Sequence, residues 1–121
     1  MEDKFSFEDL IVFQESLSFL DDVYKITNTF PKEEMYRLTS QFTRAALSIS
    51  LNIGEGSGGT KAEFINFLRI SRRSVNECLV CIIVSRRQKY INEETEKHFR
   101  AQLTKLSKMI AGLIKSISSK P

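Results

Sequence analysis

A chain of 121 residues is long enough for one domain with a hydrophobic core and too short for two such domains. Hydrophobic residues make up 41% of the chain and charged residues 27%, which is typical of globular proteins. The net charge of +3 permits a nucleic-acid or acidic protein partner, but it is far weaker than the clustered charge of a dedicated DNA-binding domain.

The sequence carries no recognisable targeting or membrane segment. Its first residues do not combine a basic stretch with an apolar stretch, so we expect no secretory signal. No apolar run approaches the ~18 residues that span a bilayer, so we expect no membrane partner. Two cysteines in such a chain favour reduced thiols, and we therefore expect a cytoplasmic protein.

Five glycines and two prolines leave few places for turns, so the chain is expected to form a few long helices. The first helix is predicted over 7–29, after a Ser6–Asp9 segment that resembles a capping box. Pro31 suits the first position of a second helix over 32–55. This helix is expected to end at closely spaced glycines, because glycine makes continued helix costly: Gly54, Gly56, Gly58 and Gly59.

The second half of the chain predicts two further helices. Thr60 and Glu63 form a capping box that begins a helix over 61–88. Asn92 can cap a fourth helix over 93–117, which has an uninterrupted apolar stripe. Short connections force neighbouring helices to run antiparallel. The sequence thus predicts an all-α fold, one domain over 1–121 that forms an up-down-up-down four-helix bundle.

An unusually apolar segment lies within the third predicted helix. Every residue from Cys78 to Val84 is apolar, so the helix is apolar on all sides there. A helix of a monomeric bundle exposes one face to water, and large exposed apolar patches are rare. We therefore expect self-association of the chain through Val80, Ile83 and Val84.

A row of polar residues follows one side of the second predicted helix: Arg37, Gln41, Arg44, Ser48, Asn52 and Glu55. The third helix offers Ser74 and Glu77 on an otherwise apolar stripe, where a carboxylate needs a partner, and Arg44 could supply it. These residues suit either a structural network that fixes helix register or a polar groove that contacts a ligand. No nucleophile or metal partner accompanies the carboxylates, so we expect no enzyme activity.

Basic residues gather on the third predicted helix, where Lys61, Arg69, Arg72 and Arg73 could contact a phosphate backbone. The alternative is an ordinary solvated face. The glycine-rich segment 54–59 is consistent with a helix–helix turn. A phosphate cradle is the other possibility, but the segment lacks the GxxxxGK[ST] order and follows no strand.

The cysteines form a CxxC pattern, Cys78 to Cys81. In redox enzymes this pattern lies at a helix N-terminus, whereas here it lies within an apolar helix. We therefore expect buried packing thiols. A zinc site would need further ligands and His98 is the only histidine, so we expect no metal and no cofactor.

Several stretches resemble the small four helix bundle protein family, also called the 23S ribosomal RNA intervening-sequence proteins. The most specific stretch runs from Leu38 to Gly56, with Gln41, Arg44-Ala45, Ser48-Ile49 and Asn52-Ile53-Gly54-Glu55-Gly56 in characteristic places. Further similarity lies in Phe7-Glu8-Asp9-Leu10, in the Tyr24 to Pro31 join and in Phe64 to Ile70. The resemblance therefore covers nearly the whole chain.

The resemblance implies a bacterial cytoplasmic bundle that assembles into a ring-shaped homo-oligomer, commonly a pentamer, with no enzyme activity. It also implies an association with nucleic acid, RNA or DNA. The leading hypothesis is an oligomeric RNA-associated protein that binds through its basic surface. The alternative is a scaffold or adaptor for a protein partner that does not contact nucleic acid.

Overall fold

A computed structural model describes residues 3–120 of the chain. Within that range the fold is all-α, with four α-helices, two short 3-10 helices and no strand. The elements in chain order are η1 (Ser6–Asp9), α1 (Ile11–Thr27), η2 (Lys32–Glu34), α2 (Leu38–Ser57), α3 (Lys61–Arg87) and α4 (Glu93–Ser118). None of these helices is long and apolar enough to cross a membrane.

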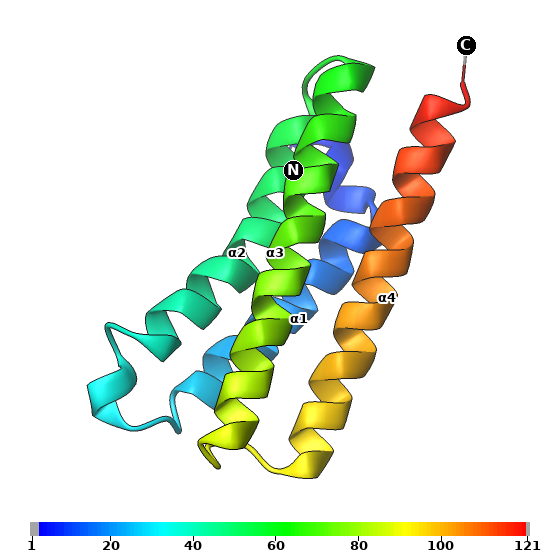
Figure 1. The fold of residues 1–121 in the computed structure, drawn as a ribbon. Helices are drawn as coiled ribbons and strands as arrows, with labels where there is room; N and C mark the ends of the chain where they lie inside the picture. The colour runs from blue at the N-terminus through cyan, green and yellow to red at the C-terminus, as the bar shows by residue number, and fades with distance from the viewer. Residues whose placement is uncertain (1–2, 121) are drawn as a thin grey trace.

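Successive α-helices run in opposite directions, as Figure 1 shows. Of the helix pairs in contact, α2–α3 is the most extensive, followed by α3–α4 and α1–α2, and α1–α4 is the least extensive. Helix α3 therefore lies between α2 and α4, and its remaining side faces solvent. This arrangement places the outward residues of α3 between two neighbouring helices.

The first helix begins later than the sequence predicted. Residues 6–9 form the 3-10 helix η1, and Leu10 has extended backbone with ψ of 126°, so α1 starts at Ile11. The N–H of Phe5 donates a 2.7 Å hydrogen bond to the Glu8 carboxylate. The capping carboxylate is therefore Glu8, not the Asp9 that was expected to pair with Ser6, and it caps a short 3-10 turn and not the long helix.

The predicted bounds of the second helix were wrong at both ends. Residues 32–34 form η2, and Arg37 has non-helical backbone (φ −123°, ψ −104°), so α2 starts at Leu38. Arg37, the first residue of the predicted polar row, therefore lies outside the helix that carries the others. At the other end, Gly54 and Gly56 lie inside α2, which continues to Ser57. A Cβ atom at Gly56 would lie 2.6 Å from Phe67, so glycine is needed there, whereas at Gly54 it would make an ordinary 3.4 Å contact with the Phe7 ring.

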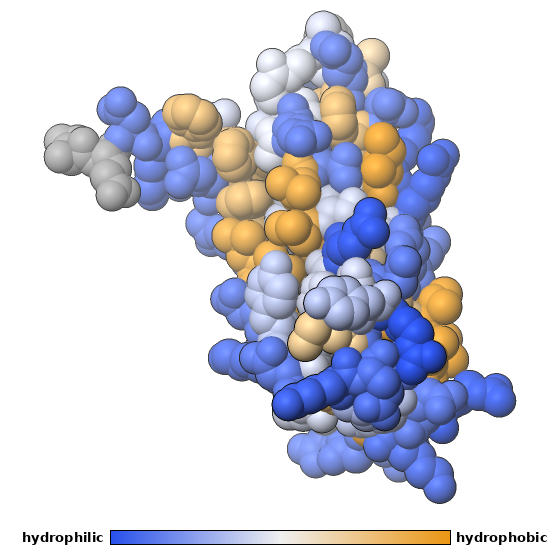
Figure 2. Space-filling view, turned by 90° about the vertical axis from the view of Figure 1, so that its left-hand side faces the viewer, coloured by the Kyte–Doolittle hydropathy of each residue, from blue (hydrophilic) through white to orange (hydrophobic). Residues whose placement is uncertain are grey.

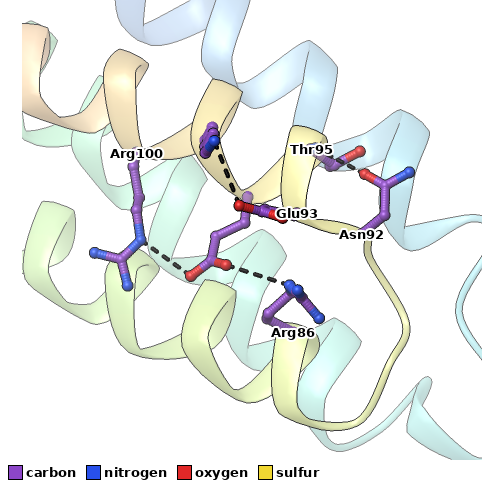
Figure 3. A network of polar contacts seen from close by, with 7 residues as sticks. Arg86, Asn92, Glu93, Thr95 and Arg100 are labelled. Carbon is purple, nitrogen blue, oxygen red and sulfur yellow. Dashed lines mark hydrogen bonds and ion pairs between the residues drawn. The ribbon is translucent and has the colours of Figure 1, made fainter.

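The starts of α3 and α4 were predicted correctly. Thr60 Oγ1 accepts a hydrogen bond from the Glu63 N–H at 3.2 Å, and the Glu63 carboxylate accepts one from the Thr60 N–H at 2.8 Å. Asn92 Oδ1 accepts from the Thr95 N–H at 2.8 Å, as seen in Figure 3. These caps satisfy N–H groups that have no partner within the helix.

Aromatic rings form the centre of the core. Phe19 of α1, Phe42 of α2 and Phe99 of α4 are almost completely buried. The Phe99 ring contacts both others edge-on, with centroid distances of 5.8 Å to Phe19 and 5.9 Å to Phe42. Aromatic pairs of this geometry stabilise a core beyond the area that they bury, so these rings join three of the four helices.

Candidate nucleic-acid interface

The three arginines of α3 lie together on its outward side. Arg69, Arg72 and Arg73 are all exposed, and with Asn76 of the same helix and Ser107 of α4 they line a surface hollow of about 330 Å³. The three residues span little more than one helical turn, so their guanidinium groups project from one region. Of the candidate phosphate-binding residues, these three are brought together by the structure.

These arginines have no carboxylate partner. Within residues 3–120, none of Arg69, Arg72 and Arg73 forms an ion pair or a side-chain hydrogen bond. Like charges held side by side repel one another, and no carboxylate of the described chain forms an ion pair with these three groups. An added anion would therefore gain attraction from all three groups.

The contrast with two other arginines is clear. Arg86 Nε lies 3.4 Å from one oxygen of Glu96, and Arg100 Nε lies 3.1 Å from the other. Figure 3 shows this carboxylate between the two guanidinium groups, near the connection from α3 to α4. The charges of Arg86 and Arg100 are thus partly neutralised, whereas those of the arginine cluster are not.

A second hollow adjoins the first between α3 and α4. Its lining residues are Val75, Asn76, Leu79, Arg100, Leu103, Thr104, Ser107 and Lys108. Asn76 and Ser107 line both hollows, so the two adjoin, and we call them together the α3/α4 groove. Lys108 is exposed and, like the arginine cluster, lacks an ion-pair partner among residues 3–120.

The groove residues on α4 were not among the predicted site residues. Arg100, Thr104 and Lys108 recur every four residues, which places them on one face of α4. That periodicity was available from the sequence, but the register between α3 and α4 was not. Lys61 lies elsewhere: it is exposed at the first position of α3, roughly 12 Å of helix rise before Arg69, and it lines neither hollow.

The polar row of α2 divides into two parts. Ser48 and Asn52 take part in a hydrogen-bonded seam between α2 and α3. Ser74 Oγ donates to Ser48 Oγ at 2.9 Å, and the Asn52 amide donates to Ser48 Oγ at 3.0 Å and to the Ser48 carbonyl at 2.8 Å. Nearby, buried Ser71 donates to the Ile49 carbonyl at 2.9 Å. These bonds fix the register of the two helices.

The expected bond between Arg44 and Glu77 is absent from the described part of the chain. Both side chains are exposed and line a shallow hollow with Gln41, Ala45 and Ser48, but no ion pair joins them. Glu77 lies one position outside the buried stripe of α3, so water solvates its carboxylate and no partner is required. Glu55 is exposed near the end of α2 and forms no side-chain hydrogen bond within residues 3–120.

The apolar segment of α3 is buried on one side only within a single chain. Cys78, Cys81 and Ile82 face the core, whereas Val80 is 59% exposed, with Ile83 and Val84 at 38% and 37%. These three exposed residues lie C-terminal to the arginine cluster on the same helix. The outward side of α3 therefore has a cationic N-terminal half and an apolar C-terminal half.

The two cysteine thiols are buried and are poor nucleophiles in the folded protein. Burial strongly raises the pKa of Cys78, and burial together with the Glu77 charge raises the pKa of Cys81 to about 11. Both are free thiols. A thiol with so high a pKa is a poor nucleophile, and both side chains pack in the core.

A second apolar surface lies over α1 and α2, away from the groove. Leu47 and Leu51 of α2 and Leu17 and Tyr24 of α1 are large and exposed. Figure 2 views the molecule from the side where α2 lies and shows hydrophobic side chains gathered there. A surface of this kind suits a protein contact better than a phosphate contact.

Fold and surface together define a small helical-bundle protein with an unpaired cationic patch. The match of residues 8–112 is to the family described as 23S rRNA-intervening sequence protein, and the chain belongs to that family. The family resemblance in the helix-two stretch is thereby confirmed. A search of curated proteins gave no match.

A solved structure supports the same assignment. It is the crystal structure of a protein of unknown function from the S23 ribosomal protein family of Bacteroides thetaiotaomicron. The two chains share 26% sequence identity and superpose with a TM-score of 0.80, over 87% of this chain and 96% of the other. The relative thus has the same fold over almost its whole length.

Proposed function

We propose that this protein is a non-enzymatic, nucleic-acid-associated bundle that binds RNA through its basic surface. The observation that carries the proposal is the exposed, unpaired cluster of Arg69, Arg72 and Arg73, which lines a hollow with Asn76 and Ser107. Arginine suits phosphate, because its planar group donates two parallel hydrogen bonds to phosphate oxygens. The family name, which refers to an rRNA insert, favours RNA over DNA.

In this proposal the working unit is a ring-shaped cytoplasmic homo-oligomer, a pentamer by family resemblance. The exposed apolar side chains of Val80, Ile83 and Val84 support self-association, because burial against a second copy would remove them from water. A ring would repeat the arginine cluster once per subunit. Several clusters acting together would bind a long polyanion much more tightly than one cluster could.

The test is a fluorescence anisotropy titration of the purified protein into labelled structured RNA and labelled duplex DNA at low salt. An Arg69→Gln/Arg72→Gln/Arg73→Gln variant should lose at least tenfold in affinity. The matched control is Lys25→Gln/Lys32→Gln/Lys89→Gln, which removes the same charge from exposed positions at the opposite end of the bundle. Equal losses in both variants, with normal circular dichroism, would mean that only net charge matters.

The alternative function is a scaffold for a protein partner, and the exposed apolar residues of α1 and α2 favour it. An apolar contact responds weakly to salt, whereas phosphate contacts weaken steeply as salt rises. If the protein binds no nucleic acid even at low salt, the scaffold becomes the better account. The arginine cluster is then a solvated surface.

A further inference from the structure

The α3/α4 groove is lined by three kinds of side chain, cationic, apolar and neutral polar, and each kind can contact a different part of a nucleotide. Four of its cations have no carboxylate partner in the described chain: Arg69, Arg72 and Arg73 on α3 and Lys108 on α4. The fifth, Arg100, is paired with Glu96. Together the four unpaired cations border the end of the groove nearer the N-terminus of α3. Phosphates would therefore be held at this end and along the rim of the groove.

The floor of the groove is different in character. Val75 and Leu103 are buried core residues, and Leu79 is partly buried beside them, yet all three line the second hollow. An apolar floor next to a cationic rim matches an unpaired base next to its own phosphate, because the base face is apolar while the backbone is charged. In a duplex the base faces are stacked on one another and cannot reach such a floor.

Neutral polar side chains complete the lining. Asn76, Thr104 and Ser107 supply an amide and two hydroxyls that can both donate and accept hydrogen bonds. Such groups can bind the Watson–Crick edges of bases, which are free only when the strand is unpaired.

The length of the groove limits how much of a strand it can hold. From Arg69 to Leu79 the groove follows ten residues of α3, roughly 15 Å. A groove of this length can hold only a short segment of a strand.

We infer that the α3/α4 groove binds a short single-stranded segment of nucleic acid, with phosphates on the Arg69–Arg73 cluster and Lys108 and unpaired bases over the apolar floor. This inference rests on the proposed function and refines it. The occupant is a single strand and not a duplex, and α4 contributes to the contact as well as α3.

The test compares four labelled octamers by anisotropy at 50 mM salt: single-stranded RNA, single-stranded DNA, duplex DNA and an abasic strand. Single strands should bind at least tenfold more tightly than the duplex and the abasic strand. Lys108→Gln should weaken single-strand binding about threefold to tenfold and reduce the slope of log K against log salt by about 0.7, the value for one lost phosphate contact.

Lys105→Gln is the matched control on the same helix. Lys105 lies three residues before Lys108, but it faces α1, where its ammonium group lies 3.0 Å from the Glu15 carboxylate. This variant should bind single strands as the unaltered protein does. Melting curves of both variants would show that the bundle is intact.

The outcomes separate this inference from the proposed function. The groove inference would be overturned if the duplex bound as tightly as single strands, or if Lys108→Gln had no effect. In either case, loss of binding in the triple arginine variant would still support the proposed function. Equal binding of abasic and ordinary strands would likewise overturn the groove inference. Failure of every octamer and of longer RNA to bind at 50 mM salt would overturn both.

Discussion

Gly56 of α2 and Phe67 of α3 approach so closely that position 56 has no room for a side chain. A Cβ atom placed on Gly56 would lie 2.6 Å from the Cβ atom of Phe67 and 3.1 Å from the Phe64 ring. Real Cβ contacts are essentially never that short, so a side chain here would push the two helices apart. The glycine therefore sets the spacing of α2 and α3 at the upper end of the bundle in Figure 1.

Gly56→Ala should destabilise the protein by about 1–3 kcal/mol, because overpacking outweighs the better helix propensity of alanine. Gly58→Ala is the control. Its backbone is ordinary (φ −85°, ψ −5°) and a Cβ atom there would meet nothing within 4 Å, so it should be neutral or slightly stabilising. Urea unfolding followed by circular dichroism measures both, and equal stabilities would disprove the close contact.

We expect Ser74 and Glu77, which lie close together on α3, to contribute differently to the stability of the α2–α3 contact. Ser74→Ala removes the hydrogen bond to Ser48 at a buried position and should cost about 1 kcal/mol. Glu77→Gln alters an exposed, unpaired carboxylate and should change the free energy of unfolding by no more than about 0.5 kcal/mol. A large loss of stability in Glu77→Gln would restore the pairing with Arg44 that the sequence suggested.

Tyr90 and Glu34 form a pH-dependent contact. The Tyr90 hydroxyl donates a 2.7 Å hydrogen bond to the Glu34 carboxylate, which lowers the pKa of Glu34 below its ordinary 4.5 and raises the pKa of Tyr90 above its ordinary 10.0. A carboxyl with a lower pKa in the folded state stabilises the fold above pH 4.5, and this stabilisation is lost as pH falls through the folded pKa. The tyrosine contribution is present below pH 10 and is lost as pH rises through its folded pKa.

Tyr90→Phe tests this contact while retaining the ring beside Phe30. The variant should melt below the unaltered protein at pH 7, and the difference in melting temperature should narrow as the pH falls from 5 to 3. Thermal melts in a series of buffers provide the measurement. A difference that stays constant over that range would contradict the assignment of the bond to an ionised Glu34.

The cysteines should be inert in the folded protein. Because the pKa of Cys81 is raised to about 11 and that of Cys78 is raised further by burial, neither thiol ionises at pH 8. A chromogenic disulfide reagent should react with both only after guanidinium is added. Rapid reaction of the native protein would show that the α3 helix opens or that the thiols lie nearer the surface.

Self-association through α3 can be tested by charge insertion. Val80→Glu places a carboxylate in the proposed subunit contact and should reduce the sedimenting mass from an oligomer towards the 13.9 kDa of one chain. Tyr36→Glu is the control, because Tyr36 is 89% exposed and lies outside α3. Identical sedimentation of Val80→Glu and unaltered protein would place any oligomer contact elsewhere.

The sequence indicated the helices wherever a local signal and the tertiary structure agreed. Thr60 and Asn92 cap α3 and α4 as predicted, because capping depends only on nearby residues. Gly56 was misinterpreted as a helix end, since its reason is a contact with Phe67, eleven residues later. The predicted stripe of α3 is buried at Ser74 and Cys81, but Glu77 on the same stripe is exposed. Glu77 lies at the edge of the buried side, which continues through Cys78 and Ile82.

The same distinction applies to the candidate site. Arg69, Arg72 and Arg73 could be grouped from their spacing on one helix, and the structure keeps them together. Ser107 and Lys108 join them only because α4 packs against α3 in one register, which no local pattern specifies. Sequence periodicity thus predicted one wall of the groove and could not predict the other.

The most direct measurement of the central claim is the salt dependence of RNA binding by the unaltered protein and the triple arginine variant. For the unaltered protein we expect a slope of log K against log salt that is about −2 or steeper. When Arg69, Arg72 and Arg73 are replaced by glutamine, the slope should become shallower by about 2, because each lost single-strand phosphate contact removes about 0.7. The same slope in both proteins, or a flat slope in the unaltered protein, would contradict the claim that these arginines hold phosphates.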